Sequence, residues 1–134
     1  MTNINFKNKT VVITGGSKGI GLDITKTFLK HQANVIVLAR NKPKRKIQSK
    51  GNAGYFIECD IRNTDSIDSA IKDIASKYKS IDVLINNAGG APMADSLTAS
   101  PKFHEAIIDL NLTAPLNLSQ KIAKKMIKQK TVSN

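Results

Sequence analysis

Residues 10–21 read TVVITGGSKGIG, in which a run of β-branched and apolar residues leads directly into four glycines within seven positions. The first part is typical of a buried strand, and Ile20 begins the spacing of an amphipathic helix. A strand that turns through glycines into a helix leaves backbone N–H groups at the positive end of the helix dipole. The stretch therefore predicts a turn that can hold a phosphate group.

The rest of the chain alternates strand-like and helix-like segments with short connections. Strands are expected at residues 9–14, 34–39, 54–59 and 82–86. Helices are expected at 19–30, at 64–78 with Thr64 as N-cap, and from the Ser100-Pro101 cap to about residue 128. In the last helix the inward positions would be Phe103, Ile107, Leu110, Ala114, Leu118, Ile122 and Met126. This alternation predicts an α/β fold with a doubly wound parallel sheet of strand order 3-2-1-4.

Length and composition favour one domain covering residues 1–134, with 21 Lys and Arg against 10 Asp and Glu and a net charge of +11. This charge favours anionic partners without choosing among them. The longest apolar run, residues 35–39, is far shorter than the roughly 20 residues of a membrane span, so a cytoplasmic protein is expected. Cys59 has no disulfide partner and is expected to be a buried structural thiol. His31 and His104 lack ligand spacing, so no metal is expected.

The glycine spacing, Gly15-x-x-x-Gly19-x-Gly21, departs from the G-x-G-x-x-G fingerprint, but TGGSKGIG at 14–21 resembles the cofactor loop of the short-chain dehydrogenase/reductase family. Three further motifs follow in the order of that family. They are Asp60-Ile61 after the third strand, NNAG at 86–89 after the fourth, and Asn111 within DLNLT. The resemblance covers essentially the whole chain and implies a Rossmann-like domain that is incomplete at its C-terminal side.

The resemblance implies a nicotinamide dinucleotide as partner and a set of residues that bind it. The expected cofactor-binding residues are Thr14, Gly15, Ser17, Lys18, Gly19, Ile20, Gly21, Arg40, Asp60, Ile61, Asn87, Ala88 and Gly89. In the family, the aspartate after the third strand lies near the adenine ring. For Asn86 and Asn87 a second reading stays open, because such asparagines can be turn residues that brace neighbouring strands.

The identity of the cofactor follows from the residue about 20 positions beyond the glycines, where an acid binds the ribose of NAD and an arginine accommodates the 2′-phosphate of NADP. Arg40 stands 19 positions after Gly21, and no Asp or Glu lies between Asp23 and Glu58. With Lys18 inside the glycine loop, the sequence predicts NADP rather than NAD. The other basic residues between positions 40 and 50 are interpreted as part of a solvated loop; they are Lys42, Lys44, Arg45, Lys46 and Lys50.

The resemblance also implies hydride transfer between the nicotinamide and a small carbonyl or alcohol, with Asn111 in the catalytic role of the family's helix asparagine. The family's Tyr-x-x-x-Lys pair is absent, because Tyr55 is followed four places later by Cys59 and Tyr78 by Asp82. Ser133 comes too early to be the family's serine. We therefore expect a cofactor-binding part, truncated before the catalytic residues and inactive alone; the alternative is a non-catalytic nucleotide-binding remnant or regulator.

Pro115 lacks an N–H, which leaves the carbonyl of Asn111 without its helical donor. That carbonyl could bind a water for proton relay, although packing alone would equally explain the proline. The long helix is expected in a subunit interface in a full-length relative of the family, which would be a homo-oligomer. Its lysines are interpreted as a soluble outer face rather than a nucleic-acid contact, since no aromatic stacking motif accompanies them.

Overall fold

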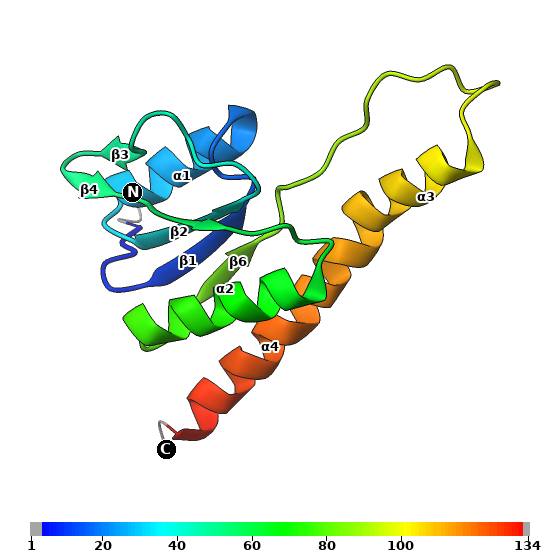
Figure 1. The fold of residues 1–134 in the computed structure, drawn as a ribbon. Coiled ribbons are helices and arrows are strands. Elements are labelled where there is room, and N and C mark those ends of the chain that lie inside the picture. Colours follow the sequence, from blue (N-terminus) through cyan, green and yellow to red (C-terminus); the bar gives the residue numbers. More distant parts are fainter. Residues whose placement is uncertain (1–3, 133–134) are drawn as a thin grey trace.

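The computed structural model describes residues 4–132, which form a parallel sheet with helices on both faces (Figure 1). The strands of this sheet are β1 (Thr10–Thr14), β2 (Asn34–Ala39), β5 (Tyr55–Glu58) and β6 (Val83–Ile85). The helices are α1 (Gly19–Lys30), α2 (Thr64–Lys77), α3 (Pro101–Ile108) and α4 (Ala114–Val132). The strand order β5-β2-β1-β6 confirms the predicted order 3-2-1-4. Ser133 lies outside the described residues, and none of the described helices is long and apolar enough to cross a membrane.

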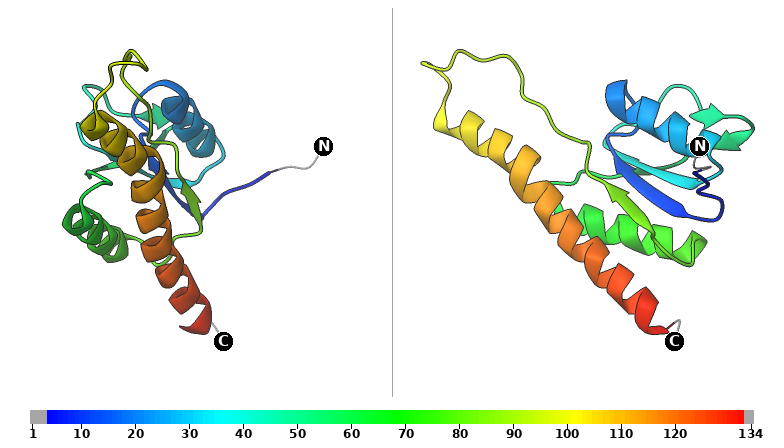
Figure 2. Two further views of the ribbon diagram at one scale, coloured as in Figure 1. Left: turned by 90° about the vertical axis from the view of Figure 1, so that its right-hand side faces the viewer. Right: turned by 180° about the vertical axis from the view of Figure 1, so that it is seen from behind.

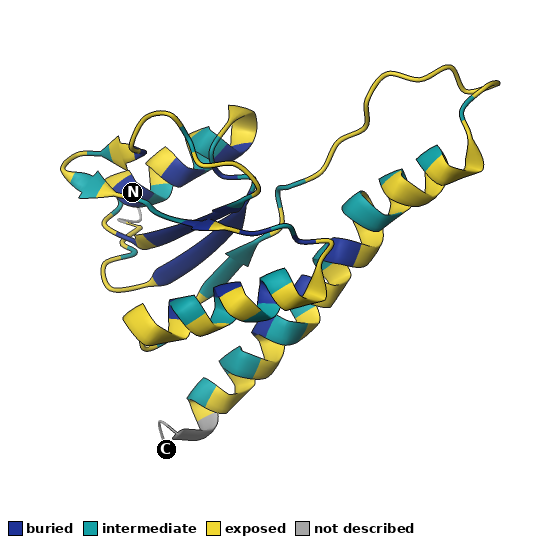
Figure 3. Ribbon diagram, viewed as in Figure 1, coloured by how far each residue is buried: buried dark blue, intermediate teal, exposed yellow. Residues whose placement is uncertain are grey.

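The central strands β1 and β2 are apolar on both sides because helices cover both faces of the sheet. Their register pairs Val11 with Val35 and Ile13 with Val37, and these four side chains pack on the α1 face with Leu29. On the opposite face, alternate residues of the same strands pack against α2 and α4. That second cluster contains Val12, Ile36, Leu38, Ile67, Ile74, Leu118 and Ile122. Figure 3 shows the resulting core as continuous buried colour on β1 and β2.

The N-cap of α2 is Asn63 and not Thr64 as predicted. The Asn63 side chain accepts a hydrogen bond from the backbone N–H of Ser66 at 3.0 Å, while Thr64 is the first helical residue. Both residue types are good caps, and asparagine is preferred over threonine at the N-cap position. The prediction therefore placed the cap one residue too late.

The inward stripe predicted for the long helix is correct from Leu110 onward, where Leu110 and Met126 also pack against the core, and wrong before it. Ala114, Leu118 and Ile122 are buried, but all eight residues of α3 are described and none of them is buried, so Phe103 and Ile107 do not reach the core. Figure 2 shows why: α3 continues the axis of α4 past the end of the sheet, so its first turns have no strand beneath them. The hydrophobic spacing is helical along the whole length from α3 to α4, but only the part from Leu110 onward packs against the core.

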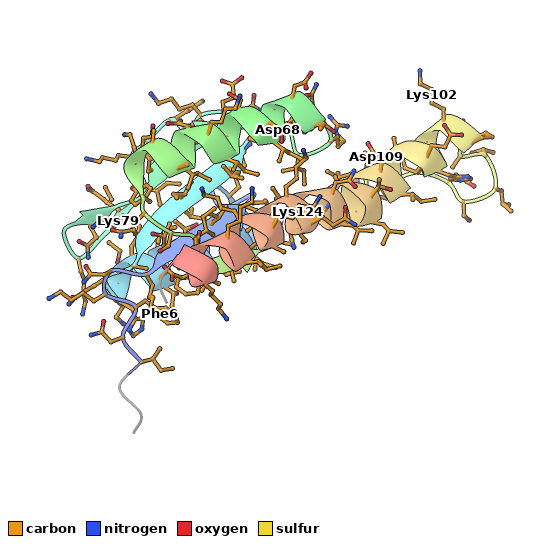
Figure 4. All side chains as sticks on the ribbon, turned by 90° about the horizontal axis from the view of Figure 1, so that it is seen from below. Phe6, Asp68, Lys79, Lys102, Asp109 and Lys124 are labelled. Carbon is orange, nitrogen blue, oxygen red and sulfur yellow. The ribbon has the colours of Figure 1, made fainter. Side chains whose placement is uncertain are left out.

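Two smaller features complete the fold. In Figure 4, α4 lies beside α2 under the sheet, where Lys121 pairs with Asp68 at 2.6 Å, while Lys102 marks the distant end of the rod. A two-stranded hairpin follows the stretch of basic residues at 40–50 that the sequence predicts to be a solvated loop: β3 (Gln48–Ser49) lies at the end of this stretch and β4 (Asn52–Ala53) just after it. No periodic pattern in the sequence indicates strands this short.

Leu118→Ala should destabilise the protein by about 2–5 kcal/mol, because Leu118 is fully buried between α4 and the sheet and truncation leaves a cavity. The matched control is Leu116→Ala, two residues away on the same helix, where the side chain is 55% exposed. Urea unfolding followed by circular dichroism measures both variants. Equal free energies of unfolding for the two variants would contradict the position of α4.

Candidate functional site

A pocket of about 280 Å³ lies where the carboxyl ends of the parallel strands meet. Such an edge is the usual ligand site of open α/β sheets, because the strand order reverses there and leaves a crevice. The glycine turn after β1 supplies one wall, and the residues after β2, β5 and β6 supply the others. The lining residues are Gly15, Ser17, Lys18, Leu38, Ala39, Arg40, Asn41, Cys59, Asp60, Ile61, Ala88, Gly89 and Leu110.

The structure brings most of the predicted cofactor-binding residues together around this one pocket. Those that do not line it are Thr14, Gly19, Ile20, Gly21 and Asn87, and the predicted catalytic Asn111 does not line it either. The lining residues that sequence reasoning missed are Leu38, Ala39, Asn41, Cys59 and Leu110. Ala39 and Asn41 directly adjoin the predicted Arg40, Cys59 adjoins Asp60, and Leu38 lies two residues before Arg40, within β2, whereas Leu110 is far from any predicted cofactor-binding residue in the sequence.

The helix α1 begins beside this pocket without a side-chain cap. Its N-cap residue, Lys18, is extended, with φ −145° and ψ 159°, and makes no capping hydrogen bond. By contrast, Asn63 caps α2, and the Ser100 hydroxyl accepts from the N–H of Phe103 at 3.1 Å in α3. The first N–H groups of a helix have no partner inside it. Those of α1 are therefore left to solvent or to a ligand in the pocket.

The glycines of the turn fall into two groups. Gly15 has φ +65°, and a Cβ there would lie 3.1 Å from the Cα of Ala88, so both conformation and space require glycine. A side chain at Gly21 would collide with the Asn87 amide and the Gly15 carbonyl. At Gly19, with φ +50°, no described atom lies within 4 Å of a Cβ. Packing thus explains Gly15 and Gly21, and also Gly16, where a Cβ would lie 2.7 Å from the Thr25 hydroxyl, while Gly19 stands at open space.

Hydrogen bonds tie the glycine turn to the end of β6. The Thr14 hydroxyl oxygen accepts from the N–H of Asn87 at 3.0 Å and of Ala88 at 2.9 Å. In return the Asn87 side-chain amide donates to the carbonyls of Thr14 at 3.1 Å and Gly15 at 3.3 Å. These contacts agree with the second interpretation of Asn87, in which the asparagine braces neighbouring strands. They fix the distance between the two walls of the pocket.

Asn111 uses its whole side-chain amide to hold the loop after β6. Its Oδ1 accepts from the N–H of Gly90 at 2.8 Å, and its Nδ2 donates to the carbonyls of Gly90 at 2.9 Å and Ile107 at 2.8 Å. It lies in a π-helical turn, Asp109–Thr113, in which the N–H of Ala114 donates to the carbonyl of Asp109. Because the side-chain amide is occupied by these contacts, a proton relay through water at this position would use the backbone carbonyl of Asn111. The free carbonyl inferred from Pro115 stays a prediction.

The charges around the pocket are positive overall. The guanidinium of Arg62 donates to Asp60 at 3.1 and 3.0 Å, and this hydrogen bonding, reinforced by the charges of Arg62 and Arg40, lowers the pKa of Asp60. The Asp60 carboxylate is thus ionised and already paired. Lys18 and Arg40 are both exposed, and within residues 4–132 neither forms an ion pair.

Cys59 is buried, as predicted, although it also borders the pocket. Burial raises the pKa of its thiol, an effect that the hydrogen bond from Ser66 opposes and the charge of Asp60 assists. A thiol with a raised pKa stays protonated near neutral pH and is a poor nucleophile. Cys59 therefore contributes an uncharged side chain to the wall of the pocket.

Comparison with known proteins gives consistent matches. The model of the short chain dehydrogenase family matches residues 9–133. A fatty acyl-CoA reductase of Mycobacterium tuberculosis is 33% identical and covers 96% of this chain, but only 46% of its own length is matched. Aldohexose dehydrogenase of Thermoplasma acidophilum, solved ligand-free, has a TM-score of 0.82 and 32% identity over 92% of this chain and 46% of its own. A short chain dehydrogenase of Leptospira borgpetersenii with bound NAD+ has a TM-score of 0.80 and 29% identity, and the match covers 91% of this chain and 47% of the Leptospira chain. The chain spans about half the length of the curated relatives it matches.

Thr14→Val should lower the free energy of unfolding by about 1–3 kcal/mol, because two part-buried backbone N–H groups lose their acceptor. Thr27→Val is the control, since the exposed Thr27 hydroxyl only donates to the Asp23 carbonyl within α1. Urea unfolding measures both, and Thr14→Ser should restore most of the loss. A Thr14→Val protein as stable as the Thr27→Val control would contradict the conclusion that the Thr14 hydrogen bonds hold the ends of β1 and β6 together.

Proposed function

The chain belongs to the short-chain dehydrogenase family, and on that premise we propose that its pocket binds a nicotinamide dinucleotide, NADP(H) in preference to NAD(H). The observation that carries the proposal is the uncapped start of α1, which opens onto a pocket bordered by Lys18 and Arg40, two cations that form no ion pair within residues 4–132. An anionic ligand there would satisfy backbone donors and side-chain charges at once.

The glycine turn fits the diphosphate of such a ligand. The N–H groups of Lys18, Gly19 and Ile20 lie at the start of α1, where the helix dipole favours negative charge. The open space at Gly19 lets a phosphate approach the backbone, and the packing of Gly15 against Ala88 keeps the turn in place. We assign Asp60 and Ile61, which lie across the pocket, to the adenine end of the ligand.

The preference for NADP(H) rests on the residues after β2. Arg40 lines the pocket at the position where an acidic residue would bind the ribose of NAD. The nearby carboxylate of Asp60 is already paired with Arg62, so its repulsion of a 2′-phosphate is reduced. The family relative from Leptospira contains NAD+, so family membership alone does not select the cofactor. Arg40 and Lys18 supply the selection in this chain.

When bound, the nicotinamide supplies hydride transfer to or from a carbonyl or alcohol carbon. This chain's residues would hold the dinucleotide, while Asn111 fixes the loop that carries Gly90 next to the pocket. No tyrosine in the 134 residues is followed four places later by a lysine that could lower its pKa. We therefore propose that these residues bind the cofactor and that proton transfer requires groups beyond them.

Arg40→Asp should weaken NADPH binding by about ten- to a hundredfold, because a charge-assisted contact is replaced by repulsion. NADH binding should be unchanged or tighter, since a carboxylate can accept from the ribose 2′-hydroxyl. Isothermal titration calorimetry measures both cofactors on both proteins. Lys50→Asp is the control, because it reverses a charge at the β3–β4 turn, outside the pocket lining. Undiminished NADPH binding by the Arg40→Asp protein would refute the assignment.

A further inference from the structure

The crossover from β2 to β5 contains no helix, which distinguishes it from the other crossovers of the sheet. Residues 40–54 run over the α1 face, as Figure 1 shows, and contain only the β3–β4 hairpin. Ile47 is the anchor of this segment, since it is 7% exposed and packs in the α1-side core. A helix would cover more of the sheet here than this extended segment does.

A second hollow, of about 420 Å³, lies between this segment and the edge of the sheet. Its lining residues are Val37, Lys42, Pro43, Lys44, Arg45, Lys46, Ile47, Gly54, Tyr55 and Phe56. It shares no lining residue with the cofactor pocket. Its volume falls in the range of about 300–1,000 Å³ that is usual for small-molecule sites.

The hollow combines an apolar floor with a cationic rim. Val37, Ile47 and the half-buried Phe56 provide the floor. Lys42, Lys44, Arg45 and Lys46 provide the rim, where all four are exposed, and none of them forms an ion pair within the described residues. No acidic residue lines the hollow. The positive charge is therefore uncompensated and stands directly beside apolar surface.

We propose that this hollow is a second ligand site, which binds a soluble phosphate monoester with an apolar chain or ring. The apolar part contacts Phe56 and Ile47, and the phosphate pairs with the cations of the rim. A concave floor holds one apolar group and does not insert into a bilayer, which favours a free small molecule over a membrane surface. This site goes beyond the proposed cofactor binding and does not depend on it.

Decyl phosphate, kept below its micelle concentration, is the probe for this site in isothermal titration calorimetry. We expect saturable binding to one site, with inorganic phosphate and decanol each bound at least about tenfold more weakly, because each supplies only half of the contacts. The double variant K44E/R45E should weaken binding of decyl phosphate by about tenfold or more. K124E/K128E, which reverses two exposed lysines of α4, should bind like the parent protein.

Further measurements distinguish a soluble phosphate ester from a membrane lipid, and binding in this hollow from binding in the cofactor pocket. Saturating NADPH should leave binding of decyl phosphate unchanged, and vesicles of phosphatidylglycerol and phosphatidylcholine should not sediment the protein. Circular dichroism checks that K44E/R45E is folded. Equal binding by K44E/R45E and the parent, displacement by NADPH, binding of inorganic phosphate as tight as that of the ester, or sedimentation with the vesicles would each overturn the proposal.

Discussion

The candidate site depends on the way in which the ends of β1 and β6 are fastened to each other. The Thr14 hydroxyl accepts hydrogen bonds from two backbone N–H groups at the end of β6, and the Asn87 side-chain amide donates two hydrogen bonds to carbonyls at the start of the glycine turn. With its position set by the neighbouring strand, the turn can enter α1 without a side chain folding back as a cap. The donors at the start of α1 are thus preorganised rather than shielded.

The sequence allowed the strand order and most of the pocket to be predicted, because both follow from strong local patterns. Continuous apolar strands alternate with helices, and the motifs at residues 14–21 and 86–89 stand at strand ends that a parallel sheet brings together. The misses have a different cause. Phe103 has helical spacing like Leu118, but the sheet ends before it, and a spacing pattern carries no information about where its partner stops.

Tertiary context also explains the short hairpin and the role of Asn111. The two strands of the β3–β4 hairpin contain two residues each, too few to show a period, and the hairpin is joined to the core through Ile47. Asn111 matched a family motif, but only the structure shows that its side chain holds Gly90 rather than facing the pocket. At the other side of the sheet, β6 is an edge strand with half-buried residues, and the expected subunit interface stays a prediction.

The most direct measurement is a ¹H–¹⁵N spectrum of the folded chain titrated with NADPH. We expect the amide resonances of Lys18, Gly19 and Ile20 to shift and their protons to exchange more slowly with solvent, because a diphosphate accepts hydrogen bonds from the donors at the start of α1. The capped starts of α2 and α3 should be unaffected in the same spectra. Saturating NADPH that leaves the α1 amides unmoved in a well-dispersed spectrum would contradict the central claim.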